Sequence, residues 1–179
     1  MNRLLCMLAA SVLALGGPAG AAPAKEYQVK AAFLFNFAQF VEWPKTAFSR
    51  PEDPFVIGVL GPDPFGSYLE DVAHGEKVGG RKIVVKRYGK AADAFGSQIL
   101  WVAGKDMATM MQDLAVLRNK PVLTVGDADG FAVEGGVIRL VMKQNKIRFR
   151  INVEAAQASG LSISAKLLSL ADIVAPGKG

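Results

Sequence analysis

The sequence predicts an α/β fold, with a central mainly parallel sheet, helices on both faces, a C-terminal antiparallel hairpin and then two helices. Two patterns indicate this class. Between residues 55 and 125, short apolar runs of strand length alternate with longer amphipathic segments, as in parallel strands joined by helices. Residues 137–151 instead alternate between apolar and charged side chains, which is typical of a half-buried antiparallel pair.

Turn residues divide the alternating region into six elements. We expect strands at residues 55–60, 82–88, 98–102 and 122–125, and helices at residues 64–73 and 106–117.

An apolar segment, residues 27–41, precedes these elements and predicts a first helix that is buried on more than one side. Its polar residues fill only a narrow stripe. Such a helix lies between the sheet and a neighbouring helix or between two subunits, and we favour the first arrangement. Pro44 disfavours helical geometry in the residue before it, so the helix should end there.

The hairpin has one register that separates its two kinds of side chain. Residues 137–143 pair with residues 146–151 across the turn Gln144-Asn145, so that Lys143 faces Lys146. All five cations then share one face with Val137 and Val141, and the other apolar residues share the opposite face. A shift by one residue would mix the two sets.

Two helices are expected after the hairpin. Asn152 is the expected N-cap of a short helix at residues 153–158. Ser162 or Ser164 caps a last amphipathic helix that includes Leu170 on its buried side.

The first 21 residues have the organisation of a secretory signal peptide. Arg3 is their only charge, an apolar run follows at residues 4–15, and small residues up to Ala21 supply a cleavage site. The run is shorter than the roughly 20 residues that a membrane-spanning helix needs. We expect cleavage after Ala21, with Ala24 as the alternative, and a single soluble periplasmic domain at residues 22–179.

Composition limits the chemistry of the exported domain. Its only cysteine, Cys6, lies in the signal peptide, so the mature chain has neither disulfides nor thiol chemistry. The formal net charge of the full chain is +5, and loss of Arg3 with the signal peptide leaves +4. An exported protein meets no genomic DNA, so this basicity indicates acidic protein or lipid-headgroup surfaces, with solubility as the simpler explanation.

Two loops that follow expected strands are candidate ligand sites. Both lack the spacing of a dinucleotide fingerprint or a P-loop, and residues 126–130 match only the first half of a calcium loop. Ordinary turns are therefore the simpler interpretation. A ligand at the carboxyl ends of parallel strands would be contacted by Gly61, Asp63, Gly66 and Asp127.

The sequence contains no recognisable catalytic motif. His74 is the only histidine and has no cysteine or second histidine to complete a metal site. We therefore expect a protein that is not an enzyme, has no metal or cofactor, and does not depend on His74.

Three segments together resemble the YfiR family of small periplasmic proteins. They are residues 30–44 (KAAFLFNFAQFVEWP), 130–152 (GFAVEGGVIRLVMKQNKIRFRIN) and 158–174 (ASGLSISAKLLSLADIV). With the α/β pattern between them, the resemblance extends over nearly all of the mature chain. No single segment is catalytic, but three long matches in the same order are specific to the family.

The resemblance implies an α/β domain, a periplasmic location and a tendency to form homodimers. The namesake of the family represses a membrane-bound diguanylate cyclase by binding its periplasmic sensor domain, and it thereby controls cyclic-di-GMP. The mature chain lacks the cysteines that link the namesake to redox state, so control by disulfides does not carry over to this protein.

The basic hairpin face is the candidate surface for such a partner. It would present a charged rim around a small apolar centre to an acidic surface. A solvated sheet face, whose cations prevent edge pairing, is the simpler interpretation. The candidate partner-binding residues are Arg139, Val141, Lys143, Lys146, Arg148 and Arg150.

Two functions follow from these observations. The leading hypothesis is a non-enzymatic periplasmic regulator that binds and restrains an inner-membrane signalling protein, either a diguanylate cyclase or a sensor kinase. The alternative is a periplasmic module that binds a small ligand at the strand ends and has no cyclase partner.

Overall fold

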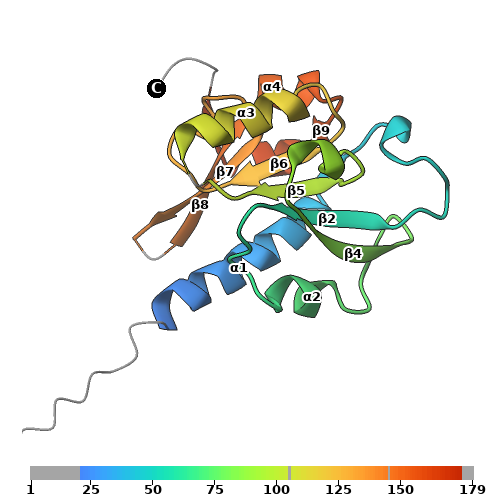
Figure 1. Cartoon of the computed structure of the whole chain (residues 1–179), viewed down its shortest axis with the longest axis horizontal. Helices are drawn as coiled ribbons and strands as arrows, with labels where there is room; N and C mark the ends of the chain where they lie inside the picture. Colours follow the sequence, from blue (N-terminus) through green and yellow to red (C-terminus); the bar gives the residue numbers. More distant parts are fainter. Residues whose placement is uncertain (1–20, 105, 145, 175–179) are drawn as a thin grey trace, which may run out of the picture.

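The computed structural model describes residues 21–104, 106–144 and 146–174, so the expected signal peptide lies outside the described residues except for Ala21. An eight-stranded sheet has the strand order β10-β8-β7-β6-β5-β2-β4-β3 (Figure 1). Its strands are β2 (Phe55–Leu60), β3 (Lys77–Val78), β4 (Arg81–Tyr88), β5 (Ile99–Val102), β6 (Leu123–Gly126), β7 (Ile138–Lys143), β8 (Lys146–Asn152) and β10 (Asp172–Val174). A second sheet pairs β1 (Val41–Glu42) with β9 (Ser162–Ile163).

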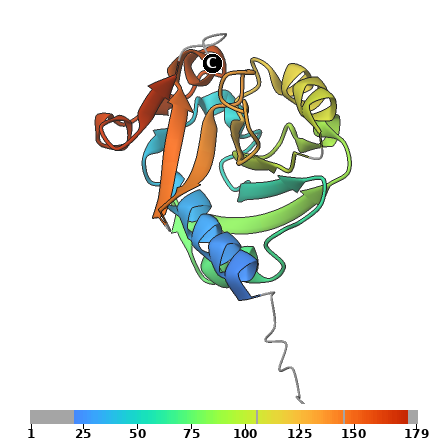
Figure 2. The same cartoon turned by 90° about the vertical axis from the view of Figure 1, so that its left-hand side faces the viewer.

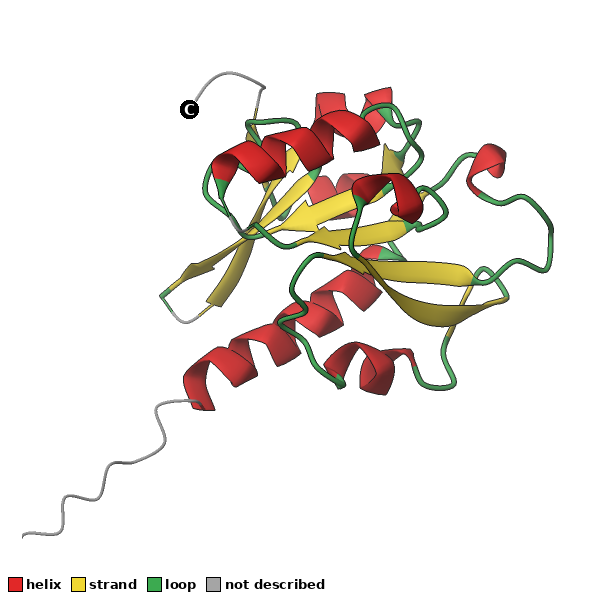
Figure 3. Cartoon of the chain, in the orientation of Figure 1, coloured by secondary structure: helices red, strands yellow, loops and turns green. Residues whose placement is uncertain are grey.

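The centre of the large sheet is parallel and carries helices on both faces. β2 pairs in parallel with β4 and β5, and β6 pairs in parallel with β5 and β7. Helices α1 (Ala21–Phe37) and α2 (Tyr68–Ala73) lie on one face, and α3 (Met107–Leu117) lies on the other (Figure 1, Figure 3). The shorter helices are η1 (Lys45–Ala47), η2 (Ala91–Ala94), α4 (Val153–Ala158) and α5 (Ala165–Leu168). The predicted α/β class is confirmed.

The register of the β7–β8 hairpin agrees with the one predicted from the charge pattern. Lys143 pairs with Lys146, Val141 with Arg148, and Arg139 with Arg150. The apolar face of the hairpin packs on α1, where the rings of Phe37 and Phe149 meet edge to face at 5.8 Å. Figure 2 shows α1 crossing this end of the sheet. The turn places Gln144 in the left-handed region, at φ 51.

The first helix ends earlier than predicted. We expected it to continue to residue 41, but it stops at Phe37, and tight-turn hydrogen bonds follow, including Phe40 N to Phe37 O at 3.0 Å. The chain must become extended here because Val41 pairs with Ile163, and the carbonyl of Phe40 accepts a hydrogen bond from Ser164 N at 2.9 Å.

The second helix begins later than predicted. Residues 64–67 form a turn, and α2 starts only at Tyr68. Gly66 has φ 58, which lies in the left-handed region and cannot form part of a right-handed helix.

The last predicted helix is wrong for most of its length. Ser164 caps α5 through its hydroxyl, as one of the two alternatives expected, but the helix ends at Leu168. Residues Asp172–Val174 then form β10, which pairs in parallel with β8. The backbone N–H and C=O groups of β8 at residues 150–152 that point away from β7 need hydrogen-bond partners, and β10 supplies them. Consequently β10, and not the hairpin, is the edge of the sheet.

Two apolar clusters form the core, one on each face of the sheet. On the α3 side, the fully buried ring of Phe131 lies against two glycines. A Cβ on Gly136 would lie 2.2 Å from Phe131 Cε1, and one on Gly126 would lie 2.7 Å from Phe131 Cδ2. These glycines are therefore required by the close approach of the ring.

A buried polar cluster fastens α1 to the carboxyl end of β6. Lys30 is 2% exposed, and its Nζ lies 2.6 Å from Asp127 Oδ2 and 2.5 Å from Glu26 Oε1. The Tyr27 hydroxyl donates to the same Asp127 oxygen at 3.0 Å. Burial, and secondarily the Asp127 charge, raises the pKa of Tyr27 to about 12. The ring of Tyr27 also meets Trp101 edge to face at 6.2 Å.

We expect Gly136→Ala to destabilise the domain by about 1–3 kcal/mol, because the added methyl must displace the buried ring of Phe131. Gly89→Ala is the matched control, since a Cβ there meets no atom within 4 Å. Urea denaturation of both variants measures the effect. Equal midpoints for the two would contradict the close packing described.

A second prediction concerns the late titration of Tyr27. The pKa of Tyr27 rises from 10.0 to about 12 in the folded chain, so the unfolded chain loses this proton first as the pH increases. Stability should therefore fall between pH 10 and pH 12, and it should fall less in Tyr27→Phe. Absorbance at 295 nm should show one late-titrating tyrosine in the wild type alone. Identical titrations would contradict the Tyr27–Asp127 contact.

Candidate partner-binding face

The predicted partner-binding residues are brought together on one face of the β7–β8 hairpin, opposite α1. The confirmed register places Val141 and Arg148 side by side, and Lys143 beside Lys146 at the tip. We call Val141, Lys143, Lys146, Arg148 and Arg150 the hairpin face. The hairpin projects beyond the rest of the sheet (Figure 1), so its tip is accessible.

Arg139 differs from the other four cations of the hairpin. Its side chain is only 15% exposed and forms an ion pair with Asp129, and its Nε lies 3.5 Å from the carbonyl of Asp127. Arg139 thus holds the loop after β6 against the hairpin. It lies at the inner end of the predicted set and is the only one of the five cations with a partner among the residues described.

The remaining four cations surround a shallow pocket of ≈ 370 Å³. Each is exposed, and none has an ion-pair partner in the described ranges. The only carboxylate in the pocket wall belongs to Asp172, which is the strand neighbour of Arg150. The basic groups lining the pocket are Lys143, Lys146, Arg148 and Arg150.

Leu170 contributes an apolar group to this pocket, which the sequence analysis missed. We expected Leu170 on the buried side of a helix, but it is 64% exposed and stands beside the cations. Residues 172–174, Asp-Ile-Val, include two β-branched residues, and this was the available signal for a strand instead of a helix. The face therefore combines four cations with apolar surface from Val141 and Leu170.

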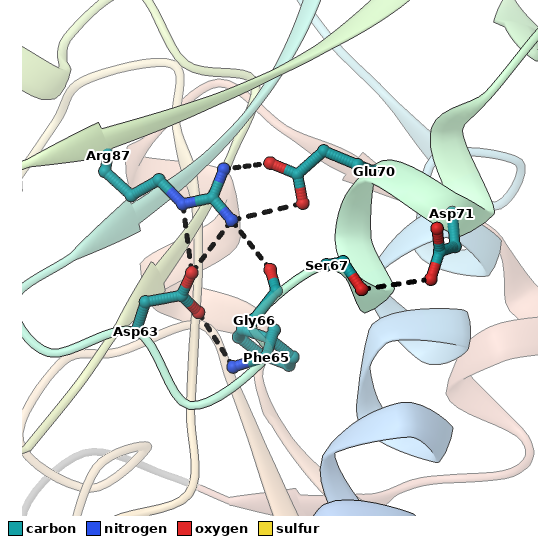
Figure 4. A network of polar contacts seen from close by, with 7 residues as sticks. All are labelled: Asp63, Phe65, Gly66, Ser67, Glu70, Asp71 and Arg87. Carbon is teal, nitrogen blue, oxygen red and sulfur yellow. Dashed lines mark hydrogen bonds and ion pairs between the residues drawn. The ribbon is translucent and has the colours of Figure 1, made fainter.

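The first predicted ligand loop, residues 61–66, is held by the protein itself (Figure 4). Arg87 on β4 donates to Asp63 Oδ2 from Nε at 2.9 Å and to the carbonyl of Gly66 at 2.9 Å. Arg87 also forms an ion pair with Glu70 of α2, and this contact lowers the pKa of the Glu70 carboxyl. Gly61 has φ 86 and donates to Tyr88 O at 3.0 Å.

The second predicted ligand position, Asp127, contacts α1. Its carboxylate accepts from both Lys30 and Tyr27, and the Tyr27 ring meets Phe65 of the first loop at 5.6 Å. Tyr27 therefore stands between the two loops at the carboxyl ends of the strands. Gly61, Asp63, Gly66 and Asp127 remain a predicted ligand site, in which Tyr27 and Lys30 of α1 already contact the Asp127 carboxylate.

The described residues offer no other obvious reactive centre. No group of three His, Cys, Asp or Glu side chains in them is arranged to hold a metal ion. His74 is the exposed C-cap of α2. None of the helices in the described part of the chain has the length and apolar character needed to cross a membrane.

One solved structure supports the architecture. A conserved domain protein from Vibrio cholerae is 14% identical, with 82% of this chain and 59% of that chain covered and a TM-score of 0.54. The ABC domain in complex with L-Trp from Streptococcus pneumonia is also 14% identical, with 67% and 55% covered and a TM-score of 0.47. This chain thus spans less than two thirds of either structure. No curated protein matches the sequence.

A family model described as YfiR/HmsC-like matches residues 27–172. The matched range begins at Tyr27, includes the whole central sheet and the hairpin, and ends at the first residue of β10. Because the match extends over most of the chain, the protein belongs to the YfiR/HmsC-like family.

Proposed function

We propose that this protein is a non-enzymatic periplasmic regulator that binds and restrains the periplasmic sensor domain of an inner-membrane diguanylate cyclase. Membership of the YfiR/HmsC-like family and the predicted signal peptide support the location and the type of partner. The observation that carries the proposal is the hairpin face, where four exposed cations have no ion-pair partner in the described chain.

Charge clustering of this kind favours a specific acidic partner. Cations close together on one face repel one another, and an acidic surface relieves the repulsion when it docks. The exposed Leu170 and the half-buried Val141 add apolar surface that is removed from water when the partner binds. In this arrangement the charges guide the partner to the face, and the apolar centre contributes to its retention.

The double substitution Arg148→Glu, Arg150→Glu reverses two charges of the hairpin face. It should lower the affinity for the membrane partner by about tenfold, or about 1.4 kcal/mol. Tagged mature protein is used to capture partners from detergent-solubilised envelopes, and mass spectrometry identifies proteins that carry a cyclase or kinase domain. Wild type should retain one such protein.

Lys82→Glu with Lys86→Glu is the matched control. These two exposed lysines of β4 lie far along the sheet from the hairpin, and the double variant has the same change in net charge. Equal loss in both double variants would indicate a general charge effect and would count against the hairpin face. Failure of folded wild type to retain any signalling protein would remove the regulator as the first choice.

Deletion of the gene should raise cellular cyclic-di-GMP, because the restrained cyclase becomes active. Complementation with the wild-type chain should restore the original level, whereas the Arg148→Glu, Arg150→Glu chain should not. Quantification of cyclic-di-GMP in extracts measures both effects. An unchanged level in the deletion strain would refute the cyclase as partner and leave a sensor kinase to be tested.

A further inference from the structure

The described part of the chain contains a second cavity on the same side of the sheet as α3. It has a volume of ≈ 280 Å³ and lies between the C-terminal end of α3 and the helix α4 that follows β8. Figure 1 shows these two helices next to each other above the sheet. None of the residues assigned to partner or ligand binding lines this cavity.

The floor of the cavity carries buried polar groups with unused donors. Thr124 is 5% exposed, and its Oγ1 accepts a hydrogen bond from Val137 N at 3.0 Å, so its hydroxyl hydrogen is left to donate. Asn152 is fully buried. Its Nδ2 donates to Ala132 O at 2.8 Å, which uses one of its two N–H groups. Each group therefore has one donor remaining next to the cavity.

The rim carries two charges of opposite sign that do not meet. Arg118, the C-cap of α3, and Glu154, in the first turn of α4, both line the cavity and are exposed. No hydrogen bond or ion pair joins either side chain to another group within the described residues. Apolar atoms of Leu114, Leu117 and Val137 make up much of the remaining wall.

From this arrangement we infer that the α3–α4 cavity is a binding site for a small organic acid that carries a carboxylate at one end and a hydrogen-bond donor at the other. The carboxylate accepts from Arg118 and from the floor donors, since all three side chains line the cavity and a carboxylate is an acceptor only. Glu154 receives the opposite end. A volume of ≈ 280 Å³ holds about nine water molecules and thus a ligand of about that many non-hydrogen atoms.

Isothermal titration calorimetry on the mature chain tests the inference, with 4-aminobutyrate as the probe. Butyrate has the carboxylate alone, and butylamine has the donor alone. The wild type should bind 4-aminobutyrate more tightly than either. Arg118→Gln should lower the affinity for 4-aminobutyrate by about tenfold, because the charge-assisted contact is lost.

Glu154→Gln should change the affinities for two of the compounds in opposite directions, which a loss of structure alone would not do. This substitution should lower the affinity for 4-aminobutyrate, because it removes the charged acceptor for the ammonium group. It should raise the affinity for butyrate, because it removes a negative charge that repels the carboxylate. Ala158→Phe should abolish binding by filling the cavity, because Ala158 lines it from an exposed position. Circular dichroism confirms that each variant is folded.

Lys86→Gln is the matched control, since it removes an exposed cation of β4 and leaves the α3–α4 cavity unchanged. It should bind 4-aminobutyrate as the wild type does, whether or not the hairpin face binds a protein partner. Absence of heat from all three compounds with folded wild type would overturn the inference. Binding that survives in both Arg118→Gln and Ala158→Phe would place the ligand elsewhere and would overturn it as well.

Discussion

The antiparallel register of β7 and β8 decides most of what this molecule presents to its surroundings. Because side chains alternate between faces, pairing Lys143 with Lys146 sends every cation of the hairpin to one side and leaves Phe149 on the side that packs on α1. A shift by one residue would bury arginines against the phenylalanine-rich helix. The apolar packing of α1 and the basic hairpin face are therefore two results of one pairing.

The same constraint explains why four of the hairpin cations can remain without ion-pair partners in the part of the chain that the structure describes. On the inner face, α1 buries Phe37 and Phe149, and the resulting apolar contacts hold the hairpin flat. The outer face is then free of any packing role, except at Arg139, which ties down the loop after β6. Exposed ion pairs contribute little to stability, so a fold gains little by adding carboxylates to this surface. Four cations that have no ion-pair partner among the described residues are thus compatible with stability and available for binding.

The sequence predicted the elements whose pattern is local and repetitive, and it failed where a tertiary contact overrides the pattern. Charge alternation was enough for the hairpin register, and alternating apolar runs were enough for the parallel sheet. The last helix was wrong because Leu170 and its neighbours fit a helical pattern, while β8 required a strand at residues 172–174. Likewise α1 stops at Phe37 because Val41 is needed to pair with Ile163, a residue far away in the sequence.

Prediction of the candidate sites was limited by the same long-range contacts. Open doubly wound sheets usually bind ligands at the carboxyl ends of their strands, and this rule pointed to the loops around Asp63 and Asp127. Here Arg87 and the α1 residues Tyr27 and Lys30 occupy those carboxylates, and no local pattern announces that they will. A buried lysine with two carboxylates is expensive to separate, because each charge would be left without its partner. The carboxylates at the strand ends are therefore engaged by the protein itself, and two pockets lie along β8, at the hairpin face and between α3 and α4. Arg150 and Asn152, two positions apart on one face of β8, line one space each. The two pockets are therefore neighbours along one strand of the sheet.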